Sequence, residues 1–68
     1  MTIGQSIRAT REKKGYSISQ LSIRAEIPYQ TIWQWETDRA MPSVLLLIFL
    51  ADTLGVTLDE LVGRTVKQ

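Results

Sequence analysis

The side chains best suited to chemistry are clustered between residues 29 and 39, and they are amides, hydroxyls and aromatic rings. They are Tyr29, Gln30, Thr31, Trp33 and Gln34, followed by Arg39. A glutamine amide presents a donor and an acceptor side by side, which matches the adenine edge in the major groove of DNA. Rings and methyl groups can contact thymine methyls. The spacing therefore indicates a surface that reads base edges, provided that one element presents these side chains together.

Other kinds of chemistry find little support in the composition. The chain contains no Cys and no His, which excludes disulfides, the common zinc sites and histidine-dependent catalysis. No pairing of a nucleophile with a base is evident either. An enzyme is therefore the least supported class of function, and we expect no cofactor and no metal.

Five short helices are expected from the caps and stops along the chain. Capping boxes pair Thr2 with Gln5, Ser17 with Gln20, and Thr57 with Glu60, while Ser43 caps a helix from Val44 to Leu54 and Gly15, Gly55 and Gly63 act as stops. A break at Glu26-Ile27-Pro28 separates the second helix from a third, Tyr29 to Glu36. The pattern predicts an all-α domain over residues 1–63, with 64–68 as a C-terminal tail.

The third helix is expected to have two different faces. Ile32, Trp35 and Glu36 share one face, and the polar and aromatic side chains lie on the others. Two helices this short cannot bury both of their faces alone, so the remaining helices must complete the core. The outer face of residues 29–36 is then left for a partner.

Charge and hydropathy set limits on that partner and on location. The net charge is only +1, but the chain up to Pro42 carries +2 and the rest carries −1, which has the right sign for phosphate binding. The apolar run from Val44 to Ala51 is too short to span a membrane, and the N-terminus lacks the features of a signal peptide. We therefore expect a cytoplasmic protein with no membrane partner.

One set of residues follows the spacing of a known family without an internal gap. It comprises Ile3, Ile7, Arg11, Gly15, Ser17, Leu21, Arg24-Ala25, Ile32, Trp35-Glu36, Pro42-Ser43 and the run Leu54 to Leu61. Over Ile3 to about Val62 the chain resembles the phage repressor/Cro family of helix-turn-helix proteins, also called the xenobiotic-response-element family. The resemblance implies a five-helix lambda-repressor-like DNA-binding domain with the helix-turn-helix at helices 2 and 3. It also implies a sequence-specific transcriptional regulator, repressor or Cro-like, with residues 29–36 in the major groove of double-stranded DNA.

The resemblance also implies roles for individual positions. Tyr29, Gln30 and Gln34 match base-contacting positions, and Trp33 lies on the same DNA-proximal face, where its alternative role is packing on a neighbouring loop. Ser17 and Arg39 match positions that touch phosphates. A further pair, Arg11 and Glu36, matches an ion pair that holds the third helix against the first.

Four positions depart from the family pattern. Ile18 replaces a phosphate-binding Gln, and Pro28 replaces the Ser or Thr that usually caps the third helix. Glu26 and Asp38 stand at turn and loop positions that are usually Gly, and both add negative charge near the DNA. A non-Gly residue with positive φ costs roughly 1 kcal/mol, so the turn at Glu26 is expected to be strained or built differently.

The fourth helix carries more apolar side chains than one inward face requires. The expected inward set is Val44, Leu47, Ile48, Leu50, Ala51 and Leu54, which leaves Leu45, Leu46 and Phe49 outside it. The outer group has two interpretations. It mediates self-association, as a homodimer through Leu45, Phe49 and the fifth helix with Val56, or it belongs to a thicker core. The same group, with the low net charge, leaves a second function open: an antitoxin or accessory protein-interaction module of this fold.

Overall fold

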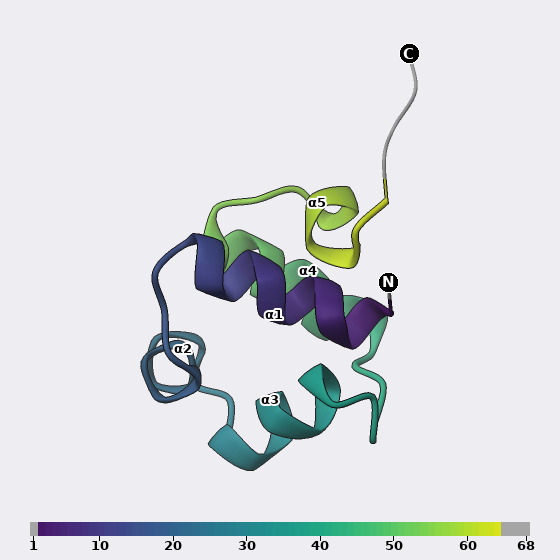
Figure 1. The fold of residues 1–68 in the computed structure, drawn as a ribbon. Helices are drawn as coiled ribbons and strands as arrows, with labels where there is room; N and C mark the ends of the chain where they lie inside the picture. The colour runs from purple at the N-terminus through teal and green to yellow at the C-terminus, as the bar shows by residue number, and fades with distance from the viewer. Residues whose placement is uncertain (1, 65–68) are drawn as a thin grey trace.

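The computed structural model describes residues 2–64, which contain five α-helices and no strand (Figure 1). The helices are α1 (Ile3–Lys13), α2 (Ile18–Ala25), α3 (Tyr29–Glu36), α4 (Val44–Leu54) and α5 (Leu58–Val62). The expected all-α class and the order of the helices are therefore confirmed. Of the expected tail, 64–68, only Arg64 is among the described residues, and its amide donates to the Asp59 carbonyl oxygen at 2.7 Å.

The helix starts follow the local caps that the sequence contains. All three expected capping boxes are present, at Thr2 with Gln5, Ser17 with Gln20, and Thr57 with Glu60. In each box the hydroxyl accepts from the backbone amide three residues on, and that residue's side chain accepts from the capping amide. Ser43 caps α4 by accepting from the Leu46 amide at 3.2 Å. These reciprocal bonds satisfy amides that a helix leaves without partners.

The five helices close around one core. Helix α1 packs against α3 and α5, α2 packs against α3 and α4, and α4 packs against α5. Figure 1 shows α3 along the lower edge, below α1, and α5 above it. The core they enclose consists of Ile7, Leu21, Ala25, Ile27, Ile32, Trp35, Leu47, Leu50, Ala51, Leu54 and Leu61. Helix α3 packs mainly on α1 and α2, and the residues on its outer face, from Tyr29 to Gln34, are exposed or partly exposed.

Helix α4 buries a narrower face than the sequence pattern suggested. Val44 is 65% exposed and Ile48 is 42% exposed, so both lie outside the core, where the expectation had placed them inside. The buried positions are Leu47, Leu50, Ala51 and Leu54, a single stripe at helical spacing. Val44 stands in the first turn and Ile48 at the margin of this stripe, and α4 packs mainly on α2 and α5. The outer apolar face is therefore larger than expected.

Within residues 2–64, none of the helices is both long enough and apolar enough to cross a membrane.

Candidate nucleic-acid interface

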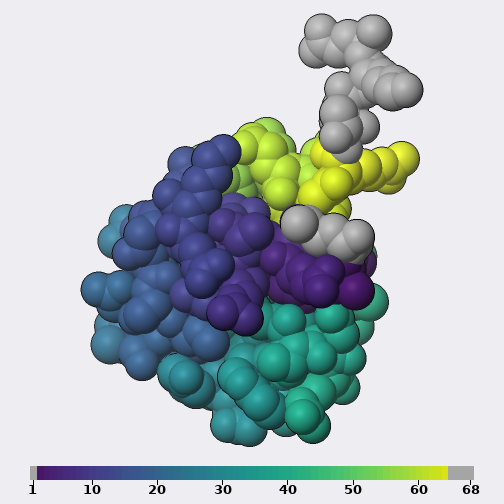
Figure 2. Space-filling model, in the orientation of Figure 1, coloured from purple at the N-terminus to yellow at the C-terminus, as the bar shows by residue number. Residues whose placement is uncertain are grey.

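The outer side of α3 brings together five of the seven expected site residues. Tyr29 and Gln30 are exposed in its first turn, and Thr31, Trp33 and Gln34 are partly exposed further along. No Lys, Arg, Asp or Glu stands among them, because the one acid of the helix, Glu36, points inward. Figure 2 shows this segment in teal at the lower margin of the molecule, with no other helix beneath it. The helix therefore presents amides, a hydroxyl and rings to whatever approaches from that side.

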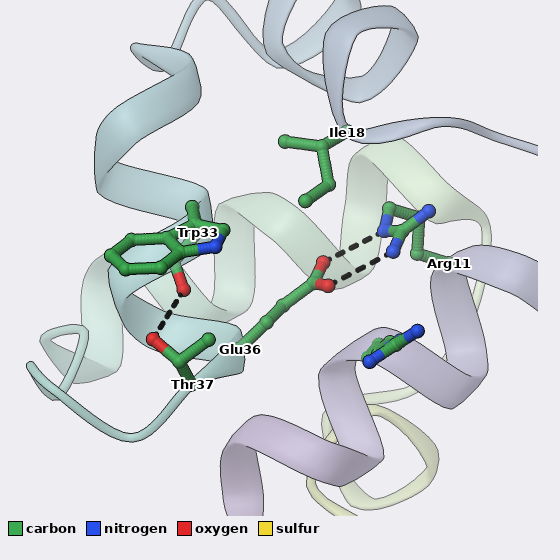
Figure 3. A pocket seen from close by; sticks show the side chains of 6 residues that line it. Arg11, Ile18, Trp33, Glu36 and Thr37 are labelled. Atoms are coloured by element: carbon green, nitrogen blue, oxygen red, sulfur yellow. Dashed lines mark hydrogen bonds and ion pairs between the residues drawn. The ribbon is translucent and has the colours of Figure 1, made fainter.

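A buried ion pair fixes α3 against α1. Arg11 Nε donates to Glu36 Oε2 at 2.7 Å, and Arg11 Nη2 donates to Glu36 Oε1 at 3.0 Å (Figure 3). The remaining terminal nitrogen, Nη1, donates to the Tyr16 carbonyl oxygen at 2.7 Å. The bonds to Glu36 raise the pKa of Arg11 above its ordinary value, so its charge is permanent. The expected Arg11–Glu36 pair is thus present and sets the direction of α3.

The turn between α2 and α3 is built without glycine. Glu26 adopts the left-handed conformation, with φ 56° and ψ 39°. The Ser22 hydroxyl donates to the Ile27 carbonyl oxygen at 2.5 Å, and the Ile27 amide donates to the Ser22 carbonyl oxygen at 3.1 Å. Pro28 then starts α3 without a side-chain cap, as its ring predicts. Sequence reasoning missed Ser22, since a serine inside a helix gives no signal of a bond to a residue beyond that helix.

Asp38, in the loop after α3, is tied to the start of α1. Its carboxylate accepts from the Thr2 hydroxyl at 2.6 Å and from the Gly4 amide at 3.1 Å. A carboxylate at this end of a helix is favoured by the helix dipole. Gly4 is required here, because a Cβ at that position would lie 2.8 Å from the Glu36 carbonyl oxygen. Sequence reasoning identified Asp38 as a replacement for a common loop Gly that adds negative charge, and it missed the bonds by which Asp38 holds the loop to α1.

Arg39 lies over the ring of Trp33. The guanidinium carbon is 4.8 Å from the ring centroid, within the range of a cation–π contact. The Thr37 hydroxyl donates to the Trp33 carbonyl oxygen at 2.8 Å, and the Arg39 amide donates to the Gln34 carbonyl oxygen at 2.9 Å. Contact with the neighbouring loop, one of the two roles expected for Trp33, is therefore present in the structure. Contact of Trp33 with DNA stays a prediction.

A shallow hollow of about 220 Å³ lies beside this ring (Figure 3). Its lining comprises Arg8, Arg11, Ile18, Trp33, Glu36 and Thr37. Ile18 is partly buried against the core, so the residue that replaces the family's Gln contributes packing. Arg8 pairs with Glu12 at 3.7 Å, with both side chains largely exposed, which makes it a solvated charge at the rim.

Ser17, the seventh expected site residue, lies at the start of α2 and is exposed. Its hydroxyl oxygen accepts from the Gln20 amide at 3.1 Å, and its own amide donates to Gln20 Oε1 at 2.8 Å. Accepting the first bond leaves the hydroxyl hydrogen for another acceptor. Over the same residues, 2–64, no cluster of Asp or Glu side chains could hold a metal ion.

The chain is similar to several known proteins. Residues 7–61 match the model of the family described as helix-turn-helix. The chain is 33% identical over 64 residues to the immunity repressor protein of Bacillus phage phi105, a match that covers 94% of this chain and 44% of the phage protein. The chain thus spans less than half the length of that relative.

Two solved structures share the fold. One is SinR, the master regulator for biofilm formation, in complex with DNA, with a TM-score of 0.80, 32% identity, and coverage of 87% of this chain and 95% of that chain. The other is the P22 c2 repressor in complex with the synthetic operator 9T, with a TM-score of 0.82, 26% identity, and coverage of 96% and 98%.

Proposed function

The chain belongs to the helix-turn-helix family, and from that membership we propose that it is a sequence-specific DNA-binding transcriptional repressor without enzymatic activity. The observation that carries the proposal is the outer face of α3, where amides and rings are exposed and charged side chains are absent. The buried Arg11–Glu36 pair holds that face in a fixed direction. The phage phi105 relative is itself an immunity repressor, and SinR and the P22 c2 repressor are bound to DNA in their structures.

Gln30 and Gln34 are the side chains that we assign to direct base recognition. They stand four residues apart, one turn along the same helix, so both can face the floor of a major groove. A glutamine amide pairs with adenine N7 and N6, and each such contact contributes about 1–3 kcal/mol of discrimination. Tyr29 and Thr31, at the start of α3, would add contacts to thymine methyls and sugars.

Phosphate contacts would fix the position of α3 on the duplex. Ser17 can donate its hydroxyl hydrogen from the start of α2, and Arg39 can donate from the loop after α3. The first amides of α3 lack a side-chain cap because Pro28 provides none, so an anion could accept from them. Acting on DNA in a bacterial cell would place the protein in the cytoplasm.

A second copy of the chain is the partner that we propose for the outer face of α4. This face consists of Val44, Leu45, Leu46, Ile48 and Phe49, and no ionisable residue occurs between Ser43 and Ala51. A face without charge can pair with its own copy around a twofold axis. In such a dimer each protomer would place its α3 in one half-site of the DNA, and the two half-sites would lie about 34 Å apart, one turn of DNA.

Selection of bound duplexes from a random DNA pool tests the function. We expect an enriched palindrome whose half-sites are about one DNA turn apart. Binding to the selected duplex should weaken steeply as salt rises, because phosphate contacts release counterions. A glutamine double variant, Gln30→Ala with Gln34→Ala, should lose the sequence preference while keeping weak, salt-sensitive binding.

The exposed α4 face also favours a second function, that of an antitoxin or accessory module that mainly binds another protein. The two functions differ in their behaviour toward DNA. No detectable binding to mixed duplexes at low salt would contradict the repressor and favour the interaction module.

A further inference from the structure

We propose that Trp33 is a positioning residue for Arg39: its ring holds the guanidinium in place to meet a DNA phosphate beside α3. The proposal rests on the function proposed above, because it assumes that α3 approaches DNA. It assigns Trp33 a supporting role in place of direct contact with bases.

The geometry of the ring and the guanidinium carries the first step. Arg39 Cζ lies 4.8 Å from the Trp33 ring centroid, and tryptophan is the aromatic side chain that attracts a cation most strongly. Arginine has many rotamers, and an exposed one loses much conformational freedom when it binds. A guanidinium already resting on a ring has lost part of that freedom before DNA arrives, which favours binding.

The backbone that carries Arg39 is also fixed. Its amide donates to the Gln34 carbonyl oxygen at 2.9 Å, and the Thr37 hydroxyl donates to the Trp33 carbonyl oxygen at 2.8 Å. The preceding residue, Asp38, is tied to Thr2 and Gly4 at the start of α1. Both ends of the Arg39 side chain are thus restrained, the backbone by the loop and the guanidinium by the ring.

No acid among residues 2–64 forms an ion pair with Arg39. The ion pairs between side chains within the described region are Arg8 with Glu12 and Arg11 with Glu36. The nearest acid in sequence, Asp38, directs its carboxylate to α1 instead. A phosphate oxygen could therefore accept from the guanidinium without displacing a carboxylate.

The surroundings of the ring also bear on whether Trp33 supports Arg39 or contacts a base. Arg39 covers one part of it, and the ring also lines the hollow that contains Ile18, Thr37 and the Arg11–Glu36 pair (Figure 3). Trp33 as a whole is only partly exposed. These surroundings favour support of Arg39 over stacking on DNA.

The test measures how affinity for the selected duplex depends on salt in four variants of the full chain. They are Arg39→Gln, Trp33→Leu, the double variant with both changes, and Trp33→Phe as the conservative control. Arg39→Gln should reduce the slope of log K against log salt by about one for each protomer bound. Trp33→Leu should reduce the slope in the same direction and weaken binding about two- to fivefold. Trp33→Phe, which keeps an aromatic face, should restore most of the affinity.

The double variant decides between support and direct contact. If Trp33 acts through Arg39, Trp33→Leu should have no further effect once Arg39 is Gln. An equal loss in both backgrounds would mean that the ring touches DNA itself, and an unchanged slope in Arg39→Gln would mean that no phosphate is bound there. Either result overturns the proposal while leaving the repressor function intact.

Two controls complete the test. Urea unfolding of each variant shows that the fold is kept, and Trp33→Phe supplies the comparison should Trp33→Leu prove unstable. A failure of Trp33→Phe to bind better than Trp33→Leu would also contradict the proposal. Absence of duplex binding by the unaltered chain would overturn the proposed function, and this inference with it.

Discussion

Arg11 and Glu36 join the middle of the chain to its first helix through a bidentate pair, with donor–acceptor distances of 2.7 and 3.0 Å. The same guanidinium also binds the Tyr16 carbonyl oxygen, so it connects α1, the loop before α2 and the end of α3. Both side chains are buried, where a charge is costly unless it is paired and hydrogen-bonded. The pair therefore contributes mainly to the direction of α3.

Breaking this pair from one side should be strongly destabilising. Glu36→Leu leaves the Arg11 charge buried without its partner, and we expect the free energy of unfolding to fall by about 3–5 kcal/mol. Urea unfolding measures the change. The matched control is Glu12→Leu, which breaks the exposed pair with Arg8 and should cost at most about 1 kcal/mol. Equal losses in the two variants would contradict the structural role of Glu36.

Removing the Asp38 carboxylate should loosen the loop after α3. Asp38→Ala deletes two hydrogen bonds to the start of α1, and we expect a loss of about 1–2 kcal/mol in the free energy of unfolding. Hydrogen exchange of the Gly4 amide should also become faster, since its acceptor is gone. Asp52→Ala, an exposed acid on α4, is the control and should change stability by less than about 0.5 kcal/mol. Unaltered exchange at Gly4 would argue against the tie.

Relieving the turn at Glu26 should stabilise the protein. Its φ of 56° is left-handed, and Glu26→Gly removes the Cβ that opposes this conformation, so we expect a gain of up to about 1 kcal/mol. Glu26→Gln keeps the Cβ and removes the charge, and it should leave stability nearly unchanged. Both variants should bind DNA more tightly if the Glu26 carboxylate repels phosphate. A stability gain in the Gln variant alone would show that charge, not conformation, limits the turn.

Introducing a charge on the outer face of α4 should dissociate a homodimer. Phe49 is 45% exposed and Leu45, one turn away, is 79% exposed, and Phe49→Glu would place a carboxylate at the proposed twofold interface. Light scattering should give the mass of one 7.7 kDa chain for the variant and twice that for the unaltered protein. Ile23→Glu, on α2 and 80% exposed, is the matched control and should leave the dimer intact. A monomeric mass for the unaltered protein would contradict the pairing.

The features that could be predicted are those governed by residues close in sequence. The caps at Thr2, Ser17 and Thr57 depend on hydrogen bonds between residues three positions apart, and all three are present as expected. For the turn at Glu26, the family resemblance left two outcomes open, a strained turn or a different build, and the structure shows the left-handed conformation. The family resemblance added the pair between Arg11 and Glu36, whose 25-residue separation no local rule spans.

The features that sequence reasoning missed depend on long-range packing. The bond between Asp38 and Thr2 joins residues 36 positions apart, and neither residue type specifies the other. Val44 and Ile48 fit an inward stripe by spacing alone, but the placement of the neighbouring helices, mainly α2 and α5, decides which part of α4 is covered. The contact between Arg39 and Trp33 requires the fixed loop between them. The base and phosphate contacts of the candidate site stay predictions.

The two tryptophans of the chain lie on one helix but in different surroundings. Trp35 is 4% exposed within the core, whereas Trp33 is partly exposed beneath Arg39. Their fluorescence should therefore report separate events. Emission from Trp35 should shift to longer wavelength when the core opens, and emission from Trp33 should change when the arginine above it moves. A Trp35→Phe variant would isolate the second signal, so that binding at the outer face of α3 could be followed without a label.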